Sequence, residues 1–189
     1  MSDTQRLDEL EARLDTALKE LDRLQAVEAI RDAVLRFCRG LDRMDQGLMA
    51  SAFHADASVD FGAIFRGGVG EFLDTTMLNQ ARQREVQHLV GNIIVRVEGE
   101  HAVAESYELA RHKSPVNAEM VDLILAMRTL DRFERREGQW RITQRTKLVD
   151  WARALQGSDQ VYERSPLPKG MRDPTDPSYA LFDPLNPQP

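Results

Sequence analysis

The chain has 189 residues, of which 42% are hydrophobic and 30% are charged, a composition typical of a globular protein rather than a disordered one. Its formal net charge of −6 argues against a nonspecific nucleic-acid binder, because such proteins carry a basic excess. The longest strongly apolar stretch, Leu123–Met127, is far shorter than the ~20 residues that a membrane-spanning helix needs. No apolar signal segment is visible near the N-terminus, and the single cysteine, Cys38, sits in an apolar stripe. We therefore expect a cytoplasmic protein with a buried thiol and with neither a nucleic-acid nor a membrane partner.

The first part of the chain has the pattern of an amphipathic helix. Leucine and alanine recur at alternating steps of three and four residues between Leu7 and Leu24, which is the a/d pattern of a short coiled coil. Two interpretations stay open for this segment. It packs on its own domain, or it forms a seam with another copy of the chain.

The helical pattern continues from Val27 and stops near residues 42–45. A second short helix is predicted at about Gln46–His54, and an extended segment follows at Ala57–Gly62. A third helix is predicted from Val69 to about Arg84, where the pattern changes to that of long strands.

The second half of the chain predicts an antiparallel meander. Turn pairs at Glu98–Gly99 and Glu137–Gly138 separate runs rich in β-branched and aromatic residues. Helices followed by such a meander indicate an α+β fold with the helices on one face of the sheet. The strands are expected at about Val86–Val97, Ala102–His112, Met120–Arg135 and Trp140–Trp151.

The C-terminal segment is rich in proline. Seven of the eight prolines lie in Pro166–Pro189, where they disfavour both strand and helix. Tyr179, Leu181 and Phe182 nevertheless give this segment large apolar groups, so we expect an irregular arm that packs on something. The predicted organisation is an amphipathic helix at 1–26, a domain at 27–152 and an extension with this arm at 153–189.

Asp42 is the first residue that could carry chemistry. Val34, Cys38 and Asp42 are spaced four apart, so they stack on one face of the first helix. A carboxylate at the end of an apolar face is either a surface group or an acid aimed into a cavity. The spacing alone favours the surface interpretation, since buried carboxylates are rare unless paired.

His88 is the second candidate. It shares one side of its predicted strand with Asn92, and both sides of that strand are otherwise largely apolar and so expected to be covered. A lone histidine in such a place is more often a core residue with satisfied nitrogens than a catalyst.

Arg145 lies in the middle of the last predicted strand. It alternates there with Lys147 and Trp151. A mid-strand arginine indicates a sheet edge or a salt bridge, and it becomes an anion site only if its face lines a cavity.

The remaining motifs give no metal or phosphate site. The four histidines are scattered and form no helical pair, and no glycine-rich phosphate loop is present. His101 and His112 fall near a turn and a strand end, so we expect both to be solvated. Neither a metal nor an organic cofactor is expected.

Four segments in the order seen here resemble the SnoaL-like members of the nuclear-transport-factor-2-like (NTF2-like) superfamily, over about Val27–Trp151. The segments are Arg36–Asp45 (RFCRGLDRMD), Phe53–Ala57 (FHADA), His88–Asn92 (HLVGN) and Phe133–Ile142 (FERREGQWRI). The resemblance implies a curved antiparallel sheet wrapped around helices, forming a cone with an apolar pocket. It also implies a likeness to lyases such as scytalone dehydratase, the bile-acid 7α-dehydratase and the lindane dehydrochlorinase.

The same resemblance implies roles for individual residues. Asp42 and His88 match an Asp–His base, and Arg145 matches an arginine of the same pocket. Phe37 stands where those enzymes have a polar tyrosine or lysine, so any proton donation from that place must come from elsewhere. Tyr107 is a candidate replacement. Besides Phe37 and Tyr107, we expect Asn92 and Trp151 to contact the substrate.

The sequence thus predicts a cofactor-independent lyase that uses an Asp–His base on a hydrophobic cyclic or aromatic small molecule. Dehydration, dehydrohalogenation and loss of formaldehyde share the proton-abstraction step, so all three are retained. An isomerase or polyketide cyclase on the same pocket, and a non-catalytic ligand-binding or assembly module, are the alternatives. Because the related lyases are often trimers, we expect a homo-oligomer, with a trimer preferred over a dimer.

Overall fold

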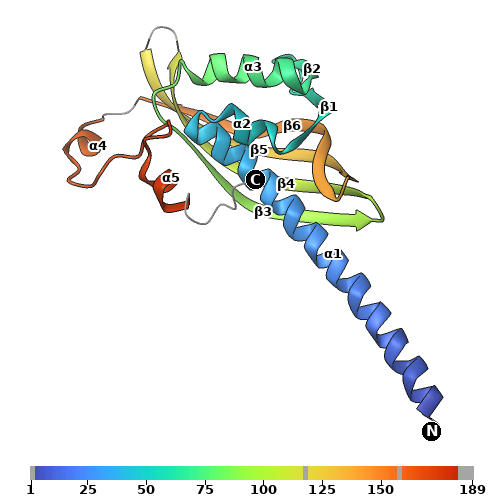
Figure 1. The fold of residues 1–189 in the computed structure, drawn as a ribbon. Coiled ribbons are helices and arrows are strands. Elements are labelled where there is room, and N and C mark those ends of the chain that lie inside the picture. The colour runs from blue at the N-terminus through green and yellow to red at the C-terminus, as the bar shows by residue number, and fades with distance from the viewer. Residues whose placement is uncertain (1–2, 117–118, 157–158, 183–189) are drawn as a thin grey trace.

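The computed structural model describes residues 3–116, 119–156 and 159–182. A curved six-stranded sheet carries helices on one face, which is the mixed α+β architecture predicted (Figure 1). The elements in chain order are α1 (Asp3–Arg43), α2 (Gln46–Ala50), β1 (Phe53–Asp60), β2 (Arg66–Gly68), α3 (Val69–Gln80), β3 (Val86–Glu98), β4 (His101–Val116), β5 (Glu119–Arg136), β6 (Gln139–Leu155), α4 (Gln160–Arg164) and α5 (Pro177–Phe182).

The sheet has the strand order β2-β1-β6-β5-β4-β3, so β2 and β3 are its edges. Strands β3 to β6 form the predicted antiparallel meander, and β1 joins β6 in parallel. Glu137 and Gly138 join β5 to β6 with φ angles of 52° and 75°. Two left-handed residues match the twist of a two-residue hairpin, which confirms the predicted turn.

The core lies between the concave face of the sheet and the helices. Ile30, Val34 and Phe37 of α1 are fully buried there, and the Phe37 ring meets Phe53 and Phe72 at centroid distances of 5.5 and 6.2 Å. This cluster fixes the second half of α1 across the sheet, so the C-terminal end of α1 lies beside β3.

The first half of α1 leaves the domain (Figure 1). All residues from Asp3 to Gln25 are exposed, and the helix becomes buried only at Ala26. An ion pair between Asp22 and Arg135, with 2.5 Å between Oδ1 and Nη1, marks where α1 leaves the sheet. The predicted helix is therefore present, but its leucines do not pack on their own domain.

Two of the predicted elements differ in extent. The second helix ends at Ala50 rather than near His54, because Phe53 begins β1 and the Ile142 amide of β6 donates to the Ala52 carbonyl. The third helix ends at Gln80 rather than Arg84.

The described part of the proline-rich arm contains a short helix, α5, that was not predicted. In α5, proline takes the first position, where its missing N–H costs no hydrogen bond.

The convex face of the sheet is uncovered in the described residues, contrary to the expectation for β3. Its exposed apolar side chains include Leu89, Ile94, Tyr107, Leu109, Leu130 and Trp151. None of the helices in the described part of the chain combines the length and apolarity that crossing a membrane requires.

Candidate active site

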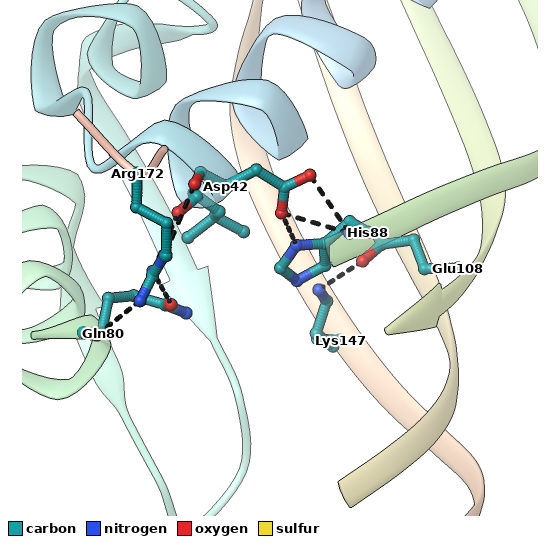
Figure 2. A network of polar contacts seen from close by, with 7 residues as sticks. Asp42, Gln80, His88, Glu108, Lys147 and Arg172 are labelled. Atoms are coloured by element: carbon teal, nitrogen blue, oxygen red, sulfur yellow. Dashed lines mark hydrogen bonds and ion pairs between the residues drawn. The ribbon is translucent and has the colours of Figure 1, made fainter. Parts of the chain in front are cut away.

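Asp42 and His88 meet at the edge of the sheet. Asp42 is the last residue but one of α1, and His88 is the third residue of β3. The Oδ1 atom of Asp42 lies 2.7 Å from Nδ1 of His88, and the two side chains are 16% and 2% exposed (Figure 2). The carboxylate is therefore a partner of a buried imidazole rather than a free surface group.

The position of β3 explains why Asp42 is held there. An edge strand leaves every second backbone N–H without a strand partner. The His88 N–H donates instead to both carboxylate oxygens of Asp42, at 3.1 and 3.2 Å. Since a carboxylate only accepts, Nδ1 of His88 carries a hydrogen, and in the neutral ring Nε2 keeps its lone pair. This is the arrangement of a histidine base with an orienting carboxylate.

His112 lies beside His88 and was not foreseen as part of the site. Its ring centroid is 5.3 Å from that of His88. The sequence predicted a solvated His112, but the residue is buried. Burial, helped by the charges of His88, Lys147 and Arg172, lowers the pKa of His112 to about 4. His112 is therefore neutral at pH 7.

Lys147 and Glu108 form an ion pair on the same concave face. Lys147 Nζ lies 2.7 Å from Glu108 Oε2, and Thr129 Oγ1 donates to Glu108 Oε1 at 2.6 Å. Burial alone would raise the pKa of Glu108, but the charge and hydrogen bond of Lys147 outweigh it and lower that pKa to about 2. Figure 2 shows this pair on the side of the His88 ring away from the arm.

Arg145 and Phe37 lie in the core rather than beside His88. Arg145 donates from Nε and Nη2 to both oxygens of Asp131, at 2.8 and 2.7 Å, and both side chains are 1% exposed. Its guanidinium lies 4.3 Å from the centroid of the Phe37 ring. The structure therefore does not bring Arg145 into the pocket of the Asp–His pair. A buried arginine paired to a buried aspartate fits the salt-bridge interpretation of the sequence.

Asn92, Tyr107 and Trp151 also lie away from His88. A bulge between Val90 and Ile93 shifts the alternation of β3, so Ile93, and not Asn92, returns to the His88 side. Asn92 is exposed.

Tyr107 and Trp151 share a hollow of about 460 Å³ on the convex face, together with the exposed Leu89. A second bulge, beside Val149 on β6, turns Trp151 to that face. These two aromatic side chains therefore do not line the pocket expected for them.

Two hollows border this site, one lined by both Asp42 and His88 and one lined by Asp42 alone of the two. One of about 330 Å³ is lined by Cys38, Asp42 and His88, and one of about 370 Å³ is lined by Asp42, Arg111 and Arg172. Larger hollows of about 500 and 620 Å³ lie on the convex face. We place the candidate site at the smaller hollows, because these two are lined by the carboxylate of the pair, and the first of them also by the imidazole.

Cys38, which lines the same hollow as this pair, is a poor nucleophile. The thiol is 4% exposed, and burial raises its pKa to about 12, so the nucleophilic thiolate is disfavoured. Among the residues that the structure describes, no three His, Cys, Asp or Glu side chains gather in a way that could hold a metal ion.

Comparison with known proteins gives the family. The model of the SnoaL-like domain matches residues 22–146. The chain belongs to the SnoaL-like domain family. No functionally curated protein sequence matches the chain.

Solved structures similar to this SnoaL-like domain share its NTF2-like, cystatin-like fold. A hexachlorocyclohexane dehydrochlorinase, LinA type 2, is 21% identical with a TM-score of 0.67, covering 74% of this chain and 95% of that one. LinA type 3 from Novosphingobium barchaimii LL02 is also 21% identical, with a TM-score of 0.67, and the match covers 74% of this chain and 96% of that one. A candidate scytalone dehydratase from Novosphingobium aromaticivorans is 22% identical, with a TM-score of 0.63, and the match covers 72% of this chain and 92% of that one.

Proposed function

We propose that this SnoaL-like protein is a cofactor-independent lyase in which His88, oriented by Asp42, removes a proton from a hydrophobic cyclic or aromatic small molecule. One observation carries the proposal: the 2.7 Å contact between Asp42 Oδ1 and His88 Nδ1, which leaves Nε2 as the acceptor. The similar LinA enzymes, which are hexachlorocyclohexane dehydrochlorinases, support the reaction class.

The chemistry follows from this orientation. His88 Nε2 takes a proton from carbon, the C–H electrons form a double bond, and the group on the neighbouring carbon leaves with its electron pair. The charge of Asp42 stabilises the imidazolium that forms. His112 stays neutral beside it, so His88 is not opposed by a second positive ring at pH 7.

Lys147 is the cation that we assign to the departing anion. Its ammonium has three N–H donors, and among the described residues it makes one hydrogen bond, to Glu108, while the Phe61 ring lies 5.4 Å from Nζ. Lys147 thereby supplies a polar group that Phe37 cannot supply, and it takes the part expected of Arg145, which is engaged by Asp131.

The test uses chloride release from γ-hexachlorocyclohexane and dehydration of scytalone as probe reactions. Asp42→Asn keeps the size of the side chain but removes its charge, and His88→Ala removes the base. We expect each variant to lose at least about 10³-fold in turnover, and the double variant little more, because the two residues act as a unit. His101→Ala is the matched control, since His101 is 74% exposed near a turn. Near-normal turnover in Asp42→Asn or His88→Ala contradicts the mechanism.

A non-catalytic binding module is the second candidate, and the small exposure of His88, 2% of its side chain, favours it. An isomerase or cyclase would use the same pair without expelling a group. Product analysis separates these classes: a lyase releases halide or water, an isomerase gives a product of unchanged mass, and a module gives no product.

We further propose that the chain works as a homo-oligomer, a trimer before a dimer, with 1–26 and 153–189 as additions to a domain at 27–152. The exposed leucines of α1 and the uncovered convex face support association between copies.

A further inference from the structure

The C-terminal arm docks on the last turns of α1, next to Asp42. Tyr179 Oη donates to Asp45 at 3.1 Å, and Asp176 forms an ion pair of 3.5 Å with Arg43. The Arg39 guanidinium lies 5.3 Å from the centroid of the Tyr179 ring. The docked segment lies outside the SnoaL-like domain matched at residues 22–146, so it is an addition to that domain.

Within the described part of the arm, Arg172 makes five hydrogen bonds to the end of α1, the end of α3 and the turn after α3. Its guanidinium donates to the backbone carbonyls of Leu41 and Asp42, at 3.3 and 3.4 Å. It also donates to the backbone carbonyl and the side chain of Gln80, at 3.1 and 2.9 Å (Figure 2). A further hydrogen bond of 2.8 Å goes to the backbone carbonyl of Gln83.

These contacts fall where two helices end. The last four carbonyls of a helix have no partner within the helix, and they carry a partial negative charge. Leu41 and Asp42 belong to the end of α1, and Gln80 is the last residue of α3. A planar guanidinium with five donors can join both ends at once, which a lysine cannot do equally well.

We propose that Arg172 is a positioning residue for Asp42: it anchors the last turn of α1 so that the carboxylate stays on His88. The inference rests on the proposed function for its catalytic meaning. The physical reason is that the 2.7 Å contact to His88 starts from a residue next to the end of a helix, where turns open most easily. Without Arg172, the carbonyls of residues 41 and 42 lose these donors, and the backbone that carries the carboxylate loses its tie to α3.

The test is hydrogen exchange at the His88 backbone amide, followed by NMR in Arg172→Met. That amide donates to the Asp42 carboxylate, so its protection reports whether the carboxylate is in place. We expect exchange at His88 to rise about tenfold or more, while the amide of Thr129 in the central strand β5 is unchanged. Arg164→Met is the matched control, because Arg164 is an exposed arginine of the same C-terminal extension. It should leave both amides unchanged.

Asp42→Ala calibrates the signal, since it removes the acceptor itself and must raise exchange at His88. Arg172→Lys keeps a charge with fewer donors and should give intermediate protection. Unchanged exchange at His88 in Arg172→Met overturns the inference. So does an equal rise at His88 and Thr129, or loss of folding in both Arg172 variants, because the arm then supports the whole domain. The readout needs no turnover, so a failure of the proposed lyase activity remains distinguishable.

Discussion

Two buried ion pairs on the concave face differ in what each can do. Arg145 donates from Nε and Nη2 to both oxygens of Asp131. Its Nη1, which has no hydrogen-bond partner among the described residues, is enclosed with the rest of the guanidinium against two phenylalanine rings. Lys147 and Glu108 leave ammonium donors available near the two histidines. Residues that look equivalent by alternation along β6 therefore separate into a structural pair and a functional candidate.

Arg145→Met should destabilise the protein by about 3–5 kcal/mol, because it leaves Asp131 buried without its partner. Burial already raises the pKa of Asp131, and the charge of Arg145 offsets this only in part. Urea unfolding measures the effect, and the double variant Arg145→Met/Asp131→Leu should recover most of the loss. A single variant within about 1 kcal/mol of the wild type would show that the pair is not structural.

His112 should make the protein less stable in mild acid. Its pKa is about 4 in the folded state against 6.5 ordinarily, so the unfolded chain binds the proton first as the pH falls. The free energy of unfolding therefore decreases from about pH 6.5 towards pH 4, by on the order of 3 kcal/mol. Glu108 contributes its own loss at lower pH, between its ordinary 4.5 and about 2.

Urea unfolding of the wild type and His112→Gln at pH 7 and pH 5 isolates the contribution of His112. The variant should lose less stability than the wild type over this interval, whereas the exposed-site control His101→Gln should lose as much. An equal loss in His112→Gln and the wild type would count against the burial of a neutral ring.

Among the elements, the two bulged strands show where sequence patterns stop being sufficient. Strict alternation along β3 puts Asn92 beside His88, and alternation along β6 puts Trp151 beside Arg145. One extra residue in each strand reverses the faces beyond it. The glycine-containing turns were predictable because their backbone angles require particular residues. The bulges could not be predicted in this way, because their backbone angles do not require a particular type of residue.

The projecting half of α1 gives a prediction about association. Its six leucines between Leu7 and Leu24 are 50–60% exposed. Replacing Leu10, Leu14 and Leu21 by glutamate should weaken assembly without changing the stability of the domain, because these positions touch nothing in their own chain's core. Sedimentation equilibrium at micromolar concentration measures this, with Asp8→Lys/Thr16→Lys on the polar side of the helix as the control. A wild-type monomer would contradict the proposed seam.

At the scale of the whole molecule, the family fold was predictable and the use of its two faces was not. The order of elements and four short segments predicted the α+β architecture, and the family match at residues 22–146 agrees. Asp42 and His88 were identified by their resemblance to a known pair. Arg172 and His112 were missed because their contacts are long-range: Arg172 meets a helix 130 residues earlier. The spacing of residues within a short segment of sequence does not predict such a contact.

The place of β3 at the margin of the sheet also bears on how copies of the chain meet in crowded solution. An edge strand with unpaired backbone groups can pair with a strand of another molecule, and the exposed Leu89 on β3 would favour such aggregation. The Asp42 carboxylate occupies the His88 N–H from within the same chain, so an incoming strand would have to displace a charged group there. The residue proposed to orient the base therefore also occupies one of the backbone donors that this edge would offer to an added strand. Asp42→Asn retains an acceptor oxygen for this N–H, whereas Asp42→Ala leaves the N–H free, so we expect light scattering to show more aggregation in Asp42→Ala than in Asp42→Asn.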